Sequence, residues 1–245
     1  MEYIHNTEQF QFHNTVVALG KFDGMHKGHQ LIFDELIQYK QLGYQAAVFS
    51  FDRPPLNMLK HKHMRVIYTT NEKIKLLARR GIDIYIEHPF TDEFSHLSPE
   101  DFVIKVLLEK TGMKVLVVGD DCGFGYKRQG NVELLERMSK EYDFKLIVIP
   151  KLELEGEIVS STRIRHLLSE GKVEEANRLM EDPFMICGSV VHGNHMGAEV
   201  LQMPTANQIP LEDKLLPPNG VYVSRIHYKD ETYYGISNVG VKPTI

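Results

Sequence analysis

Short apolar runs alternate with amphipathic stretches over the first 180 residues of the chain. Five runs are almost continuously apolar, as in strands that helices cover on both faces of a parallel sheet: residues 16–19, 46–51, 82–86, 115–118 and 146–149. Between them, apolar residues recur at helical spacing over residues 29–41, 72–80, 99–110 and 132–142. This alternation predicts an α/β fold with a doubly wound parallel sheet.

Local signals support these helices. Gly43, Gly81 and Gly112 follow three of the amphipathic stretches, where a helix commonly ends in a left-handed residue that glycine adopts freely. Ser98 and Pro99 open the third stretch as a cap and a first-turn proline.

The pattern changes near residues 181–183. Strand-like runs follow at 187–191, 221–227 and 233–239, separated by glycine, proline and asparagine and with no helical pattern between them. We therefore predict two domains, residues 1–183 and residues 184–245, of which the second is a small all-β unit.

Composition limits the classes of function. The chain has 245 residues, 42% of them hydrophobic, which is enough to build a core. A net charge of −5 argues against a broad surface for nucleic acid or anionic membrane. No apolar run approaches the roughly 18 residues of a membrane helix, and the N-terminus lacks a signal-peptide pattern. Cys122 and Cys187 form neither a disulfide framework nor a CxxC metal site. We expect a cytoplasmic protein whose partners are small molecules.

Residues 20–29 carry the most informative motif. They directly follow the first buried run and open the first helix, so they fall at the carboxyl edge of the sheet, where ligands bind. Glycines let backbone N–H groups approach a phosphate, and the helix N-terminus adds partial positive charge. His26 and His29 stand three residues apart and can face one anion during phosphoryl or nucleotidyl transfer. A surface histidine pair and part of a zinc site are the alternatives; the glycines and the strand-to-helix position favour the phosphate.

Two further segments fall at the same edge. Residues 158–165 combine three hydroxyl residues with Arg163 and Arg165, which predicts a capped helix whose first-turn arginines face a phosphate. A capped helix with solvated arginines is an equally good interpretation. In residues 118–125, Asp121 could hold hydroxyl groups and Phe124 could stack on a ring. Residues 125–131 have the glycine spacing of a P-loop but lack its lysine, so no P-loop is predicted.

The second unit contains one candidate metal motif. Thr205 and Asn207 stand two residues apart in a Pro-Thr-Ala-Asn sequence, and their oxygens could support a hydrated magnesium ion with nucleotide phosphates. A turn that leaves a strand is the simpler interpretation of the same residues.

Taken in order, these segments resemble the prokaryotic bifunctional riboflavin kinase/FAD synthetase family over essentially the whole chain. Residues 20–29 are similar to its His-x-Gly-His signature, 118–125 to its flavin-side loop and 159–165 to its Ser-Ser-Thr-Arg-x-Arg segment. The resemblance implies a Rossmann-like nucleotidyltransferase domain followed by a small all-β, barrel-like kinase domain. It also implies an FMN adenylyltransferase that converts FMN and ATP into FAD and pyrophosphate, with Mg²⁺ as the bridging cation.

The resemblance gives each candidate residue a role. His26, His29 and Arg163 are expected at the reacting phosphates as catalytic residues. Asp121 and Phe124 are expected on the flavin side. The residues expected to bind ATP are Gly20, Phe22, Asp23, Gly24, Gly28, Ser160, Ser161, Thr162 and Arg165.

The second unit departs from the family pattern. Residues 197–203 lack the usual Gly-Arg pair and a later glycine, and the sequence stops before the position of the family's catalytic glutamate. We therefore expect riboflavin kinase activity to be weak or absent, with Thr205 and Asn207 as vestigial magnesium ligands. The alternatives are a bifunctional enzyme without its distal tail, a non-catalytic flavin- or nucleotide-binding regulator, and a nucleotidyltransferase for another phosphorylated acceptor.

Overall fold

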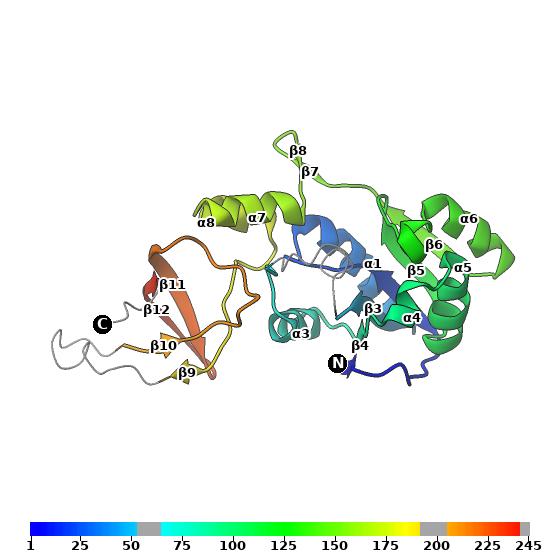
Figure 1. Ribbon diagram of the computed structural model, residues 1–245, viewed down its shortest axis with the longest axis horizontal. Helices are drawn as coiled ribbons and strands as arrows, with labels where there is room; N and C mark the ends of the chain where they lie inside the picture. The colour runs from blue at the N-terminus through cyan, green and yellow to red at the C-terminus, as the bar shows by residue number, and fades with distance from the viewer. Residues whose placement is uncertain (53–64, 192–204, 241–245) are drawn as a thin grey trace.

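The computed structural model describes residues 1–52, 65–191 and 205–240. It contains a central β-sheet (Figure 1). The six strands lie in the order β1-β4-β3-β2-β5-β6, with all neighbours parallel. The strands are β1 (Glu2–His5), β2 (Thr15–Leu19), β3 (Gln45–Phe51), β4 (Ile84–His88), β5 (Met113–Gly119) and β6 (Lys145–Ile149). All five predicted runs are strands. The exposed edge strand β1 was not predicted, because its residues show no buried apolar run.

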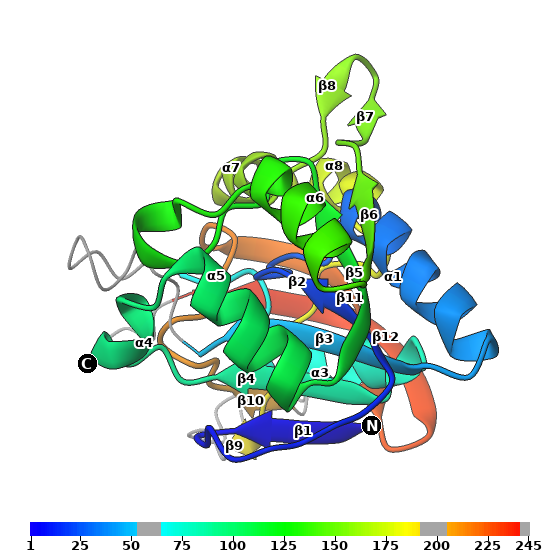
Figure 2. The same ribbon diagram turned by 90° about the vertical axis from the view of Figure 1, so that its right-hand side faces the viewer.

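Helices cover both faces of this sheet, which confirms the doubly wound architecture (Figure 2). One core cluster contains apolar residues of α1 (Lys27–Gln41), α3 (Thr70–Arg79), α7 (Ser161–Ser169) and α8 (Val173–Leu179). The cluster on the other face contains α6 (Val132–Glu141) and a helix that begins as α5 (Pro99–Asp101) and continues as the π-helix η1 (Phe102–Lys110). Two short elements complete this part, α4 (Asp92–Ser95) and the 3₁₀ turn η2 (Tyr126–Arg128).

The helix boundaries follow the local signals. Gly43, Gly81 and Gly112 have φ angles of 94°, 85° and 61°, so all three adopt the predicted left-handed conformation. The Ser98 side chain accepts a hydrogen bond from the backbone N–H of Asp101 at 3.0 Å, and the predicted cap is confirmed.

The direction of the chain across the sheet reverses at β2. From β2 the chain passes to β3 and β4 on one side, then crosses to β5 and β6 on the other. The connections that leave the carboxyl ends of the adjacent strands β2 and β5 therefore run to opposite sides of the sheet. Ligands of open α/β sheets bind at such a switch point.

The C-terminal part consists of antiparallel ladders. β9 (Val190–Val191) pairs with β10 (Asn207–Gln208), and β11 (Gly220–Tyr228) pairs with β12 (Glu231–Val239). In Figure 1 these ladders lie at the end of the molecule opposite α6. The predicted all-β character is confirmed; over the described residues the ladders do not join into one sheet, so the barrel-like form is not confirmed. A smaller hairpin, β7 (Glu153–Leu154) with β8 (Glu157–Ile158), projects between β6 and α7.

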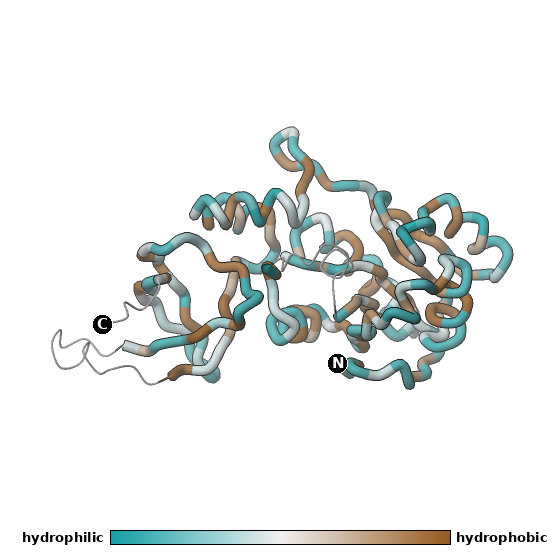
Figure 3. The backbone as a smooth tube through the Cα atoms, viewed as in Figure 1, coloured by the Kyte–Doolittle hydropathy of each residue, from teal (hydrophilic) through white to brown (hydrophobic). Residues whose placement is uncertain are grey.

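Apolar residues concentrate along the strands of the parallel sheet (Figure 3). By contrast, both faces of the β11–β12 hairpin expose large apolar side chains. None of the helices in the described part of the chain combines the length and apolarity needed to cross a membrane.

Candidate active site

The connection from β2 to α1 has a strained backbone. Phe22 and Met25 have φ angles of 48° and 37°, in a region that costs a non-glycine residue about 1–3 kcal/mol. The Asp23 side chain holds this loop. Its Oδ1 accepts hydrogen bonds from the backbone N–H groups of Ile67 and Tyr68 at 2.9 and 3.2 Å, and its Oδ2 pairs with Arg165. Such strain is characteristic of loops that are shaped for a ligand.

Glycines of the loop leave room for its rings. A Cβ atom at Gly20 would lie 2.9 Å from the Phe22 ring, and one at Gly28 would lie 3.1 Å from Nδ1 of His26. Gly24 has a φ of 83°, and a Cβ there would lie 3.0 Å from Ile67. We expected these three glycines to shape the nucleotide pocket. A side chain at any of them would crowd the loop, so the conformation of the loop depends on them.

His26 and His29 are stacked where α1 begins. Their ring centroids are 3.6 Å apart and their planes differ by 19°. The Nδ1 atom of each ring is buried and has no hydrogen-bond partner within the described residues. Because buried polar atoms are nearly always paired, these two nitrogens indicate a place for a ligand.

Burial keeps both imidazoles neutral at pH 7. Desolvation lowers the pKa of His26 to about 4, although the Asp121 carboxylate opposes this shift. Desolvation, and then repulsion from His26, lower the pKa of His29 well below its usual value. Each neutral ring still carries one N–H donor. The pair can therefore bind an anion through hydrogen bonds, and a bound polyphosphate would favour protonation.

The N-terminus of α7 lies against the same loop. Ser160 caps the helix by accepting a hydrogen bond from the backbone N–H of Arg163 at 3.2 Å. A cap by one of the three hydroxyl residues was predicted, and the structure shows which one forms it. Ser161 donates from Oγ to the backbone carbonyl of Asp23 at 2.5 Å. Thr162 is exposed. Two of the motif's residues, Ser161 and Arg165, thus join α7 to the loop after β2.

The two arginines of α7 have different surroundings. Arg163 pairs with Glu157 of β8 at 2.9 Å, and its Nη1 is buried with no hydrogen-bond partner in the ranges that the structure describes. Arg165 forms a salt bridge with the Asp23 carboxylate. The prediction that both lie in the first turn is correct for Arg163 and wrong for Arg165, because the cap at Ser160 places Arg165 in the second turn.

Of the two residues expected from the loop after β5, only Asp121 lies near the histidines. Asp121 is exposed, acts electrostatically on His26 and pairs with Lys151 at 3.3 Å. Phe124 is only 5% exposed and packs against Phe102 in the core. The structure therefore gives Phe124 a packing role, and its expected stacking on a ligand ring finds no support in this conformation.

Two cations of this edge were missed by the sequence analysis. Desolvation, followed by repulsion from Arg128 and then from Arg165, lowers the pKa of Lys21, so each guanidinium lies near enough to act on this ammonium group. Lys21 follows Gly20 directly and could have been found from the motif. Arg128 could not, because it returns to the site only through the pairing of Phe124 with Gly130. Like charges gathered near one another are common at functional sites.

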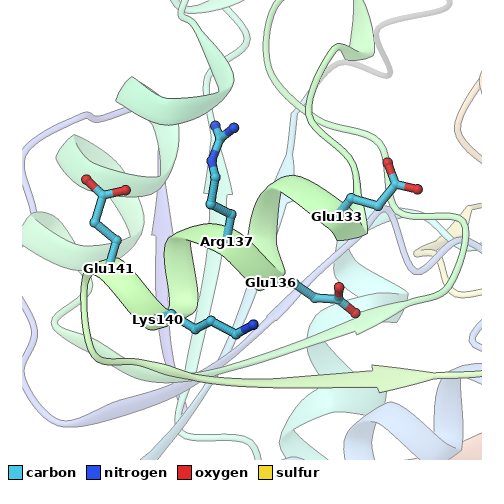
Figure 4. Close-up of a pocket in the computed structure, with 5 residues that line it drawn as sticks. All are labelled: Glu133, Glu136, Arg137, Lys140 and Glu141. Atoms are coloured by element: carbon cyan, nitrogen blue, oxygen red, sulfur yellow. The ribbon is translucent and has the colours of Figure 1, made fainter.

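The remaining candidates lie elsewhere. Thr205 and Asn207 are exposed in and beside β10, and residues 197–203 lie outside the described residues. Across the described ranges, no group of three His, Cys, Asp or Glu side chains could hold a metal ion. A hollow along α6 is lined by charged side chains of that one helix (Figure 4) and contains no predicted site residue.

Comparisons with known proteins match this arrangement. The FAD synthetase family model matches residues 8–163, and the riboflavin kinase family model matches residues 180–245. Three relatives are named bifunctional riboflavin kinase/FMN adenylyltransferase. The one from Buchnera aphidicola subsp. Schizaphis graminum is 38% identical over 98% of this chain and 78% of its own. Those from Listeria monocytogenes and Escherichia coli K12 are 35% and 31% identical, over 99% of this chain and 78% of theirs.

One solved structure is also similar over almost the whole chain. It comes from Streptococcus pneumoniae and is titled a macrolide-efflux protein. It superposes with a TM-score of 0.86 at 30% identity and covers 99% of this chain and 79% of its own. This supports the arrangement of the α/β unit and the C-terminal ladders.

The comparisons correct the expectation of a degenerate kinase. That expectation depended on residues 197–203 and on where the sequence stops. The riboflavin kinase model nevertheless matches residues 180–245, and relatives whose names carry both activities align with nearly the whole chain. The doubt about riboflavin kinase activity is therefore not supported.

Proposed function

Because the chain belongs to the family of bifunctional riboflavin kinase/FMN adenylyltransferases, we propose that its α/β unit transfers AMP from ATP to FMN. A phosphate oxygen of FMN attacks the α-phosphorus of ATP, the bond from that phosphorus to the bridging oxygen breaks, and FAD and pyrophosphate result. The second phosphate pKa lies near 6, so FMN is largely dianionic at pH 7. The nucleophile therefore needs no general base.

The stacked histidines carry this proposal. They lie at the N-terminus of α1, beside the point where the sheet reverses, and their unpartnered nitrogens can receive phosphate oxygens once a nucleotide binds. Donors fixed in advance at the site of developing charge typically contribute 10²–10³-fold to a rate. His26 and His29 stabilise the negative charge that develops on the reacting phosphates.

The cationic side chains complete the phosphate site. Arg163 has an unpartnered guanidinium nitrogen, and guanidinium groups bind phosphates bidentately, so we place it on the β- and γ-phosphates. Lys21 and Arg128 add positive charge at the same edge. Arg165 holds Asp23, and thereby the loop, in addition to its expected contact with ATP. Asp121 faces the flavin nucleotide.

Magnesium enters this reaction with the substrate, as MgATP. The described residues offer no three-ligand metal cluster, and Mg²⁺ commonly binds through substrate phosphates and water with few protein ligands. The protein's task is then to orient the phosphates that carry the ion.

The experiment is to incubate the protein with FMN, ATP and Mg²⁺ and to separate the flavins by chromatography. We expect FAD and an equal amount of pyrophosphate. Parallel reactions with other phosphorylated acceptors in place of FMN test the alternative that the protein is a nucleotidyltransferase for a different acceptor. Binding of FMN or ATP without FAD formation would favour the alternative of a non-catalytic flavin- or nucleotide-binding regulator.

A second activity is favoured by the match of residues 180–245 to the riboflavin kinase model. We propose that the C-terminal unit phosphorylates riboflavin with MgATP, with Thr205 and Asn207 near the magnesium and phosphates. The test is FMN formation from riboflavin and MgATP by the protein and by Thr205→Val. Loss of FMN formation in this variant, with FAD formation from supplied FMN retained, is the expected result. No FMN from the unaltered protein would contradict the proposal.

A further inference from the structure

A lysine of the C-terminal part is buried against the α/β unit. Lys214, beyond β10, is 2% exposed. Its Nζ donates hydrogen bonds to the backbone carbonyls of Ile67 and Met185, at 2.6 and 2.7 Å, and to the Glu72 carboxylate at 2.6 Å. Three acceptors match the three protons of an ammonium group. The rings of Tyr68 and Phe184 lie 5.2 and 4.5 Å from the same nitrogen, so the charge is enclosed on several sides.

Glu72 is the counter-ion, and both of its carboxylate oxygens accept hydrogen bonds. It is 0% exposed, and besides Lys214 it accepts hydrogen bonds from the backbone N–H groups of Thr69 and Cys187 at 2.8 and 2.7 Å. Removing one member of a buried pair leaves the other charge uncompensated. The pair therefore constrains every segment that contributes to it, namely the start of α3 and the chain around residues 187 and 214.

The strongest constraint falls on residues 66–68. Val66 forms a two-bond ladder with the chain beside Lys214: its N–H donates to Asp213 at 2.7 Å and its carbonyl accepts from Leu215 at 2.8 Å. Ile67 is then bonded on both sides, since its carbonyl accepts from Lys214 and its N–H donates to Asp23.

Asp23 belongs to the strained loop after β2. It receives the N–H groups of Ile67 and Tyr68, pairs with Arg165 and accepts the Ser161 hydroxyl at its backbone carbonyl. Only Ile67 separates Lys214 from this residue. The loop that begins α1 and carries His26 is thus held partly by a segment of the C-terminal unit.

We propose that Lys214 is a positioning residue for adenylyl transfer: through Ile67 it fixes Asp23, so that the geometry of the nucleotide loop depends on docking of the C-terminal segment. This inference rests on the proposed adenylyltransferase function. It gives the C-terminal unit a role in FAD synthesis that is separate from any chemistry of its own.

The test compares Lys214→Met with Lys73→Met. Lys73 lies on the same helix as Glu72 and forms a comparable, partly buried pair with Glu87 at 3.3 Å, but no described hydrogen bond joins that pair to residues 66–68. The rate of FAD formation by each variant is expressed per folded molecule. Lys214→Met should raise the KM for ATP about tenfold, in the range for residues that act through others, and change the KM for FMN much less. The control should change neither. A merely structural role would lower the folded fraction at an unchanged KM, and that result would overturn the proposal.

Amide hydrogen exchange supplies a second measurement. In the unaltered protein, MgATP should slow exchange at Ile67 and Tyr68 and also at Leu215. Protection confined to the loop and α1 would overturn the coupling, even if Lys214→Met fails to fold.

The two proposals fail separately. If the unaltered protein makes no FAD, the proposed function falls, and exchange at Ile67 in ligand-free Lys214→Met against Lys73→Met still decides whether Lys214 orders this segment. If FAD forms and the KM for ATP is the same in Lys214→Met, only the coupling falls.

Discussion

The imidazole rings of His26 and His29 lie face to face, with centroids 3.6 Å apart, where α1 begins. Each ring removes water from the other, and both carry an unpartnered buried nitrogen within the described residues. Two apolar side chains would pack equally well without leaving buried nitrogen atoms unpaired. The arrangement is therefore better explained by a ligand that supplies the missing partners than by stability.

Replacing His29 should impair the reaction more than the fold. His29→Ala should lower the rate of FAD formation about 10²–10³-fold, the usual effect of removing one preorganised donor. Circular dichroism and thermal melting should show a folded protein. His166→Ala is the matched control, because His166 lies on α7 with its ring exposed, and it should keep full activity. Near-normal turnover of His29→Ala would contradict the phosphate role.

The low pKa of His26 predicts how stability changes with pH. The folded-state pKa is about 4 against 6.5 for the unfolded chain, so the unfolded state binds more protons between these values. Stability should therefore fall as the pH decreases from 6.5 toward 4. The loss is about 2 kcal/mol by pH 5.

The variant His26→Gln removes this contribution. Urea unfolding at several pH values should show a loss between pH 7 and pH 5 that is smaller by that amount than in the unaltered protein. Above pH 7 the two stability curves should run parallel. Equal slopes below pH 6.5 would mean that His26 is not buried as a neutral ring.

Arg163 should discriminate between the two substrates. Arg163→Ala should raise the KM for ATP more than the KM for FMN, since its guanidinium is placed on the β- and γ-phosphates. Glu157→Ala removes the partner of Arg163 but leaves the guanidinium, and it should change both constants little. A selective effect on FMN would reverse the assigned orientation of the substrates.

Two glycines with positive φ should differ in their tolerance of alanine. Gly43 has a φ of 94° and open space where a Cβ would lie, whereas Gly125 has a φ of 68° and its Cβ would lie 2.7 Å from the backbone of Pro99. Gly43→Ala should cost about 1–2 kcal/mol, the penalty of the left-handed conformation. Gly125→Ala should cost at least about 1 kcal/mol more, because overpacking is added to a backbone conformation, φ 68° and ψ −174°, that is essentially restricted to glycine. Urea unfolding measures both, and equal losses would contradict the crowding at Gly125.

Much of the α/β unit was predictable because its signals are local or periodic. Continuous apolar runs identified β2 to β6, since a parallel strand buries both faces. Ser98 and Gly43 marked helix ends, and the hydroxyl residues 160–162 marked another, because caps depend on a few neighbouring residues. β1 escaped notice because an exposed edge strand needs no such run.

The candidate site was predictable in outline only. The motif at residues 20–29 identified both histidines, and the order of strands and helices placed them at the carboxyl edge. The stacking of the two rings, their lowered pKa values and the position of Arg128 near Lys21 depend on how distant segments pack. For the same reason Phe124, which follows a strand in a glycine-rich loop, belongs to the core.

By itself the sequence determined the alternation of strands and helices, the loops at their ends and the motifs that we propose to bind phosphate. All of these depend on neighbours within a few positions along the chain. Only the tertiary structure decided that Lys214 meets Glu72 and that Asp23 holds Ile67. A buried charge acquires its partner from a segment 142 residues away, and no local pattern encodes that choice, because it is the packing of the whole chain that removes water from both groups.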